Sequence, residues 1–228
     1  EPILDFSLFK IRTFAAANLA NFLNFVAYSS LLVLMPFYLE EVLELSPEQA
    51  GVLMSAIPLT VFIIAPISGY LADKFGTRGL SVMGGCVSST VLLAMAGLFG
   101  SGLDEKTLHP YVLVGLCMVG MASGLFQSPN NVALMSSIPL DKLGVASALM
   151  ATIRNLGLVT GTGLAAKVFS WKHAATGDFV KAFHASLFVA GFMSLGVIGA
   201  SLMNQVRSTH SPWMKNSRKE SGPYFSEA

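Results

Sequence analysis

The sequence predicts an all-α membrane protein built from six transmembrane helices. Of its 228 residues, 53 % are hydrophobic and only 12 % are charged. The apolar residues come in long blocks, whereas a soluble core shows short alternating patterns. Alternating segments of about 10 residues, which would indicate a barrel, are absent from the sequence. Because lipid cannot satisfy backbone polar groups, a helical bundle is the expected fold.

Six apolar runs are each long enough for the roughly 20 residues that a spanning helix needs. Arg154, in the fifth run, is the only charged residue within them. We place the spans at about 14–36, 50–72, 80–101, 111–135, 144–166 and 183–204. Residues 1–206 then form one transmembrane domain, and residues 207–228 form a cytoplasmic tail that is expected to be disordered.

Basic residues are distributed unequally between the two sets of loops. Nine Lys and Arg residues lie on the side that holds both termini, and four lie on the other side. The positive-inside rule therefore predicts a cell-membrane protein with both termini in the cytoplasm. An acidic cluster after the first span would face outward, and it consists of Glu40, Glu41, Glu44 and Glu48.

The first span carries a polar stripe at steps of three and four residues. On a helix these steps confine the side chains to one face about 120° wide. Three asparagines facing lipid would be costly, so this face is expected to point into the protein. The stripe consists of Asn18, Asn21, Asn24 and Tyr28.

The stretch GYLADKFGTR joins the second and third spans and concentrates charge between two uncharged runs. Gly76 permits a tight turn, and Lys74 and Arg78 supply the positive charge of a cytoplasmic loop. Asp73 is disfavoured by the dipole of the helix that it ends, so it needs compensation from a basic residue or from a neighbouring helix N-terminus. Gly69, one turn earlier, lets that neighbour approach. These residues predict a conformational latch that forms or breaks at small cost.

The fourth span repeats the polar arrangement of the first. Amides that only hydrogen-bond between helices would contribute roughly 0.6 kcal/mol each. Two such stripes instead favour a shared substrate cavity. Asn and Gln carry donors and acceptors without fixed charge, which suits neutral or cationic organic solutes. The second stripe consists of Ser123, Gln127, Asn130 and Asn131.

Arg154 is the only charge committed to the membrane interior. A helix that starts near Gly144 places it about 15 Å deep, where insertion costs roughly 2.5–3.5 kcal/mol. No Asp or Glu lies within the six runs. Its partner would be backbone carbonyls, water, an anionic substrate group or a carboxylate outside this chain. We assign it to the cavity, and the alternative is a locally satisfied arginine without a functional role.

Small residues at a spacing of four indicate close helix packing in two spans. Gly157 and Gly161 follow Arg154 in the fifth span, and Gly120 and Gly124 occur in the fourth. Small residues at this spacing let another helix approach.

A weak internal repeat relates the second and fifth spans at an offset of 93 residues, which places Gly51 on Gly144 and LADKF on LAAKV. The two spans cross the membrane in opposite directions. The sequence therefore predicts a three-plus-three inverted repeat.

The motif G-x-L-A-D-x-x-G-x-R, formed by Gly69, Leu71, Ala72, Asp73, Gly76 and Arg78, resembles the signature loop of the major facilitator superfamily. The run IPLDKLGVASALMATIRNLGLVTGTGLA is similar to the penultimate helix of the fourteen-helix drug:proton antiporter branch. The opening LDFSLFKIRTFAAAN resembles the segment that enters the C-terminal half of that branch.

The resemblance implies the C-terminal six-helix half of a secondary transporter, in which the first and fourth spans line the cavity. It implies proton-coupled export of small amphipathic or drug-like compounds by alternating access, with the N-terminal half of the same protein and the lipid bilayer as partners. A metabolite facilitator or symporter for a sugar or organic acid is the alternative within the superfamily. A non-transporting six-helix scaffold or sensor is the alternative of another class.

The sequence carries no enzyme signature such as G-x-S-x-G or H-E-x-x-H. Cys86 and Cys117 show no metal-ligand spacing. We therefore expect no catalytic residues, no metal and no cofactor, with the proton gradient as the energy source, and no nucleic-acid partner.

Overall fold

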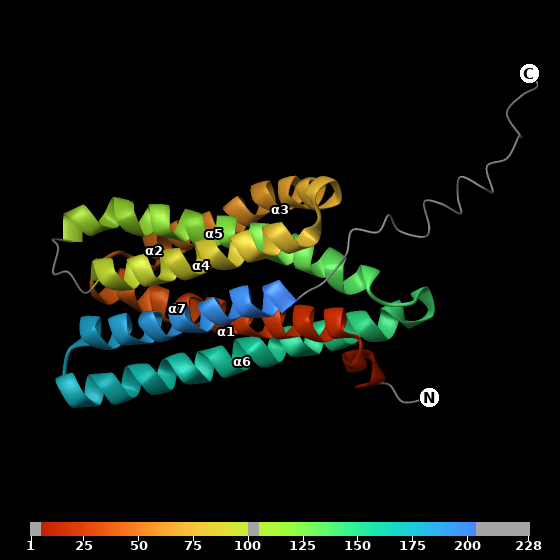
Figure 1. Cartoon of the computed structure of the whole chain (residues 1–228). Helices are drawn as coiled ribbons and strands as arrows, with labels where there is room; N and C mark the ends of the chain where they lie inside the picture. The colour runs from red at the N-terminus through yellow and green to blue at the C-terminus, as the bar shows by residue number, and fades with distance from the viewer. Residues whose placement is uncertain (1–5, 100–104, 204–228) are drawn as a thin grey trace, which may run out of the picture.

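The computed structural model describes residues 6–99 and 105–203, and these are helical over nearly their whole length (Figure 1). The tail expected at 207–228 lies outside the described residues. The elements are η1 (Phe6–Lys10), α1 (Arg12–Glu41), α2 (Pro47–Met54), α3 (Ala56–Phe75), α4 (Thr77–Phe99), α5 (Glu105–Ser136), η2 (Leu140–Lys142), α6 (Leu143–Thr176) and α7 (Phe179–Met203).

Six helical stretches of the described chain are long and apolar enough to cross a membrane. Two of them differ from the runs that hydropathy marks. The second span is divided at Ser55 into α2 and α3. The helix of the fifth span continues beyond position 166 to Thr176. Lys167 and Lys172 lie in this extension, and because lysine is a good helix former, the end of the apolar run does not end the helix.

Ser46 begins the second span with a capping box. The Gln49 backbone N–H donates to Ser46 Oγ at 3.3 Å, and the Ser46 N–H donates to Gln49 Oε1 at 3.1 Å. Pro47 occupies the first helical turn, where its missing N–H removes no helical bond. The chain therefore changes from loop to helix at a defined residue.

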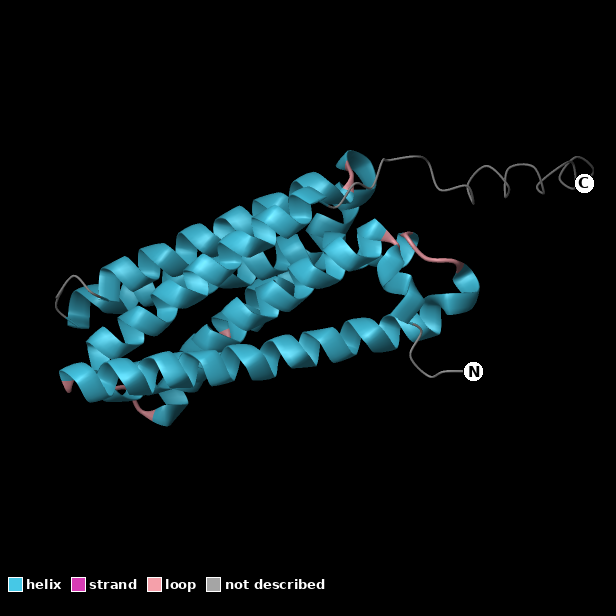
Figure 2. Ribbon diagram, turned by 60° about the horizontal axis from the view of Figure 1, so that its bottom comes forward, coloured by secondary structure: helices cyan, strands magenta, loops and turns pink. Residues whose placement is uncertain are grey.

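The long helices lie side by side along a common axis (Figures 1 and 2). The start of α1, the α3–α4 turn and the α5–α6 connection lie at one end of the bundle. The α1–α2 and α6–α7 connections lie at the opposite end. The two ends therefore correspond to the two sets of loops that differ in basic charge.

The main helix contacts, apart from the more extensive packing of α6 on α7, have the symmetry of a repeat. The main neighbours of α1 are α6 and α7, the main neighbours of α5 are α3 and α4, and α4 packs on α7. This list maps onto itself when the first three spans are exchanged with the last three. The arrangement is that of a three-plus-three repeat.

The crossing of α1 and α6 depends on glycine. A Cβ on Gly157 would lie 2.8 Å from the Phe22 carbonyl oxygen, and one on Gly161 would collide with the Val26 carbonyl oxygen. Ser30 Oγ donates a hydrogen bond to the Gly161 carbonyl oxygen at 3.3 Å. The two backbones approach closely because neither glycine has a side chain at the crossing.

The crossing of α3 and α5 is built in the same way. A Cβ on Gly120 would lie 2.6 Å from the Ile57 carbonyl oxygen, and one on Gly124 would lie 2.9 Å from Ile64 Cγ2. Ser68 Oγ donates to the Gly124 carbonyl oxygen at 2.7 Å. Each crossing thus combines glycines on one helix with a serine donor on the other.

The two serine–glycine bonds occupy repeat-related positions with the residue types exchanged. Gly161 follows Ser68 by 93 residues, the offset of the weak sequence repeat, and Gly124 follows Ser30 by 94. At these two positions a serine in one copy of the repeat corresponds to a glycine in the other.

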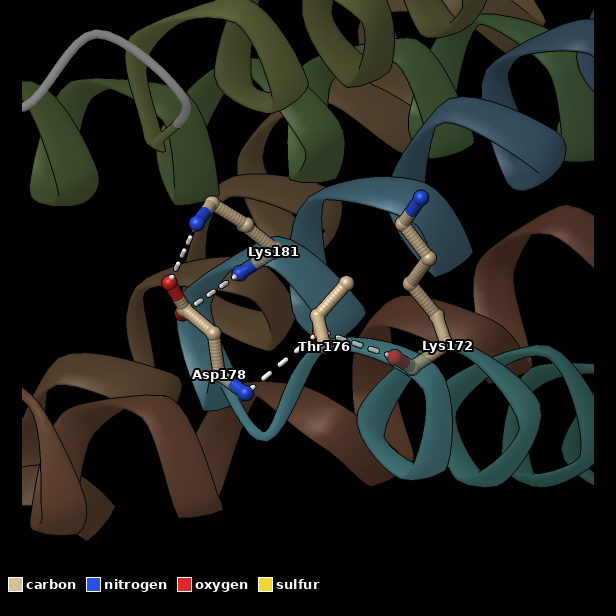
Figure 3. Close-up of polar contacts among 4 residues, drawn as sticks. All are labelled: Lys172, Thr176, Asp178 and Lys181. Atoms are coloured by element: carbon tan, nitrogen blue, oxygen red, sulfur yellow. Dashed lines mark hydrogen bonds and ion pairs between the residues drawn. The ribbon is translucent and has the colours of Figure 1, made fainter.

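Gly177 and Asp178 form the turn between α6 and α7 (Figure 3). Gly177 has a left-handed backbone with φ of 65°, which favours glycine. Asp178 Oδ1 accepts the Lys181 backbone N–H at 3.1 Å, and Oδ2 pairs with Lys181 Nζ at 3.1 Å. The hydrogen bond from the Lys181 backbone N–H lowers the pKa of Asp178 below the ordinary aspartate value, and the hydrogen bond from the Lys181 side chain has the next largest effect. The carboxylate therefore serves as the N-cap of α7 in its ionised form.

The second and fifth spans present the most open faces of the bundle. Only 17 % of the apolar stretch of either span is buried inside the bundle, whereas 61 % of the apolar stretch of α1 is buried. Phe62 on α3 is 79 % exposed, and Val159 on α6 is 72 % exposed. The open face of α6 also carries the polar residues Thr152 and Asn155. A face of this mixed composition is costly against lipid alone.

Replacing Gly161 with Ala tests the α1–α6 crossing. Overpacking of this kind destabilises by about 1–3 kcal/mol, whereas Gly to Ala in a free helix position stabilises by about 1 kcal/mol. We expect Gly161→Ala to lower the thermal unfolding midpoint of the detergent-solubilised full-length protein. The control is Gly199→Ala, because no atom lies within 4 Å of its added Cβ. Equal midpoints for the two variants would contradict the crossing.

Candidate functional site

A polar cavity lies where α1, α5 and α6 meet. Its volume is about 60 Å³, and each of the three helices contributes side chains to it. The cavity combines donors, one fixed positive charge and an apolar wall. The lining residues are Asn21, Phe25, Gln127, Asn131, Met150, Ala151 and Arg154.

Each helix supplies the cavity with a pair of side chains four residues apart. The pairs are Asn21 with Phe25, Gln127 with Asn131, and Met150 with Arg154. Side chains at i and i+4 lie one above the other on the same face of a helix. The local spacing therefore aims both members of each pair at the same space once the three helices pack.

Arg154 is held beside α1 by the glycine crossing. Its Cζ lies 6.0 Å from the centre of the Phe25 ring. Gly157, one turn further along α6, would place a Cβ 3.0 Å from Phe25 Cβ. A guanidinium over an aromatic face gains about 0.5–1 kcal/mol at an exposed site. No hydrogen bond or ion pair joins Arg154 to another described residue. Because the Phe25 ring carries no net charge, the positive charge of Arg154 is not neutralised within the described residues.

Four of the residues predicted to line the cavity lie inside the bundle instead. Asn18 Nδ2 donates to the Phe14 carbonyl oxygen at 2.9 Å, and Asn130 Nδ2 donates to the Ala17 carbonyl oxygen at 3.1 Å. Asn24 and Ser123 do not line the cavity either, although burial does not set them apart from Asn21, which lines it and is 3 % exposed. The assignment of these four residues to a substrate cavity stays a prediction.

The angle between neighbouring positions on a helix explains why only part of each stripe lines the cavity. Successive residues are about 100° apart, and residues three apart differ by about 60°. A stripe about 120° wide can therefore have its centre at a cavity and its edges in helix contacts. Asn130 is fully buried, whereas Asn131 is exposed.

Tyr28 lies on the same side of α1 as Asn21 but does not line the cavity. It is partly buried and packs edge-on against Phe25, with 6.3 Å between the ring centres. The cavity wall is completed by apolar residues that the sequence does not single out. Phe25 and Met150 are four residues from Asn21 and Arg154, and that spacing is the only sequence signal that could have found them.

The GYLADKFGTR stretch, residues 69–78, includes the α3–α4 turn. This turn lies at the end of the bundle that holds the start of α1 (Figure 1). Gly76 has φ of 89°, and its N–H donates to the Ala72 carbonyl oxygen at 2.8 Å. Asp73, Lys74 and Arg78 are exposed. No ion pair joins Asp73 to another residue in the described part of the chain. The compensation expected for Asp73 is therefore not an ion pair within the described residues.

Gly69 brings this loop against α5. A Cβ at this position would lie 3.1 Å from Ser128 Oγ. Nearby, Lys74 Nζ lies 5.4 Å from the centre of the Phe75 ring. The loop is thus anchored to the bundle by its glycine side and presents its charges outward.

Among the described residues, no group of three His, Cys, Asp or Glu side chains is placed to hold a metal ion. Cys86 and Cys117 are free thiols. The side chains that line the α1–α5–α6 cavity offer hydrogen bonds and one positive charge.

Comparison with known proteins places the chain among transporters. The model of the Major Facilitator Superfamily matches residues 17–225. The chain is similar to the riboflavin transporter RibZ of Clostridioides difficile (strain 630), with 34 % identity over 172 residues, which cover 75 % of this chain and 36 % of RibZ.

Two further relatives are similar over a comparable share of the chain. The uncharacterized transporter YebQ of Escherichia coli (strain K12) is 32 % identical over 72 % of this chain and 35 % of its own length. The multidrug efflux pump LfrA of Mycolicibacterium smegmatis is 30 % identical over 74 % of this chain and 32 % of its own length. The chain thus spans about a third of the length of the curated relatives that it matches.

Cysteine labelling of two adjacent residues tests the cavity. In the full-length protein, with Cys86 and Cys117 of this chain and any other cysteine replaced by alanine, we expect Asn131→Cys to react with a water-soluble methanethiosulfonate reagent. Asn130→Cys is the matched control and should react at least about tenfold more slowly, because a thiol must be accessible to be attacked. Equal rates, or no reaction at either position, would contradict the site.

Proposed function

The chain belongs to the major facilitator superfamily, and we propose that it forms the C-terminal half of a secondary transporter that moves small amphipathic solutes by alternating access. The six apolar helices and the family make it a multi-pass membrane protein. The observation that carries the proposal is the cavity between α1, α5 and α6. It brings Arg154 and three amides together between helices that are long and apolar enough to cross a membrane. In such a position polar groups are costly unless they border water, a solute or a partner.

A second half would cover the open faces of α3 and α6. Two features support this partner. The relatives are about three times as long as the matched segment, and the open face of α6 mixes Val159 with Thr152 and Asn155. The cavity would then lie between the two halves, and rocking of one against the other would expose it to each side in turn.

We propose that the termini of this segment face the cytoplasm of the cell. The support is the excess of Lys and Arg on that side, nine against four. The GYLADKFGTR loop then faces the cytoplasm, where Asp73 would be a latch that is compensated by the other half when the cytoplasmic side closes.

Several relatives are named as multidrug resistance proteins, transporters or efflux pumps, which supports export of drug-like compounds. We propose the proton gradient as the energy source for this export. No Asp or Glu lies within the predicted spans of this chain. A carboxylate that carries the proton would therefore belong to the other half.

A metabolite transporter is the second candidate. It is favoured by the similarity to a protein named as a riboflavin transporter, at 34 % identity. The same cavity would serve either function, because fold alone does not specify the solute.

Flux through the full-length protein in proteoliposomes tests the proposed coupling. We expect an imposed pH gradient to drive accumulation of at least one drug-like solute from a small panel, because proton flow supplies the energy for uphill movement. An uncoupler should abolish the accumulation. Flux that is equal with and without the gradient would remove proton coupling and would favour a facilitator.

Replacing Asp73 with Asn tests the latch. Loss of the carboxylate should shift the balance between the two access states, and an equilibrium coupling of this kind is worth about 5-fold or more. We expect Asp73→Asn to slow transport by that factor while leaving membrane insertion intact. Asp141→Asn is the control, because Asp141 is exposed in the α5–α6 connection at the same end of the bundle. Unchanged transport in Asp73→Asn would contradict the latch.

A further inference from the structure

We infer that the solute held at the α1–α5–α6 cavity is an amphipathic organic anion rather than a lipophilic cation. The inference rests on the proposed function, since it names the substrate class of the same site. It also differs from what the amide stripes alone suggest, because amides by themselves suit neutral or cationic solutes equally well.

The first step is the charge of the cavity. Arg154 is the only charged residue that lines the cavity, and its guanidinium lies over the face of the Phe25 ring. No hydrogen bond or ion pair joins it to another described residue, and the predicted spans contain no Asp or Glu. The cavity therefore has a net positive charge within this half.

The second step is the supply of hydrogen-bond donors. A guanidinium has five N–H donors and no acceptor. The side-chain amides of Asn21, Gln127 and Asn131 each add an NH₂ group to the same cavity. A carboxylate, phenolate or similar oxygen anion can accept several of these bonds at once, and hydrogen bonds to a charged acceptor are the stronger ones.

The third step is the remaining wall. Phe25, Met150 and Ala151 offer apolar surface next to the donors. Because the cavity of this half measures only about 60 Å³, it would hold the anionic oxygen edge of an amphipathic solute, and the apolar body would lie along the apolar wall toward the other half. An inorganic anion would leave the apolar wall unused.

A cationic solute would face the opposite situation. Its charge would meet the guanidinium in a medium of low dielectric constant, where repulsion is far stronger than in water. This repulsion could be removed by a carboxylate supplied from the other half of the transporter. That arrangement predicts the reverse preference, so the two cases are separated by measurement.

The test compares two probes on one scaffold in the purified full-length protein. Fluorescein is an anion at mildly alkaline pH, and the methyl ester of rhodamine is a cation with the same xanthene ring. We expect fluorescein to bind at least about tenfold more tightly, as measured by fluorescence anisotropy in detergent or nanodiscs. Tighter binding of the cation, or no binding of fluorescein, would overturn the inference without any variant being made.

Variants of Arg154 then assign the preference to the cavity. Arg154→Gln should weaken fluorescein binding about tenfold or more and leave the cation unaffected or more tightly bound. Arg154→Lys keeps the charge but loses the planar donor fork, so it should retain part of the affinity. Lys167→Gln is the matched control, because it removes one exposed positive charge from the same helix outside the cavity. Unchanged fluorescein binding in Arg154→Gln would overturn the inference.

The outcome is distinguishable from failure of the proposed function. Gradient-driven uptake of cations alone would leave a transporter and overturn the anion site. Arg154-dependent binding of fluorescein without flux of any solute would support the anion site and remove transport.

Discussion

The close crossing of α1 and α6 sets the position of Arg154, the only charged residue within the predicted spans. Gly157 and Gly161 bring the two backbones together, and a side chain at either position would meet α1. Arg154 is one turn before Gly157, so the same contact sets its guanidinium beside Phe25. Arg154 is exposed on α6, and it reaches Phe25 because the two helices lie close together. The functional site is therefore a consequence of small-residue packing.

The same construction on the other side of the bundle explains its overall plan. Gly120 and Gly124 let α5 approach α3, as Gly157 and Gly161 let α6 approach α1. In both crossings a serine hydroxyl donates to a glycine carbonyl oxygen on the facing helix. Two equivalent crossings related by exchange of the repeats leave α3 and α6 with their outer faces open. The bundle is thus held together at the α1–α6 and α3–α5 crossings, and the outer faces of α3 and α6 are left without a packing partner in the described residues.

The amide side chains of this bundle have two different kinds of surroundings. Asn18 donates its amide N–H to the Phe14 carbonyl oxygen within α1, whereas Asn130 on α5 donates its amide N–H to the Ala17 carbonyl oxygen of α1, so only Asn130 joins two helices. Asn21, Gln127 and Asn131 line a cavity together with Arg154. The first use needs no ligand, whereas the second leaves a positive charge that the described residues do not neutralise. This difference separates structural amides from those that can recognise a solute.

The sequence by itself determined the class of the protein, the six spanning helices and the two ends of the bundle, because hydropathy, helix length and loop charge are local properties of the chain. It also pointed to Asn21, Gln127, Asn131 and Arg154 among a larger set of polar residues. It could not separate Asn131 from Asn130, because periodicity gives the angle of a residue on its own helix and not the neighbour that packs there. Only the tertiary structure placed Arg154 in one cavity with the amides and gave Phe25 and Met150 a part in its wall. The reason is that residues more than a hundred positions apart meet only after the glycine crossings have formed.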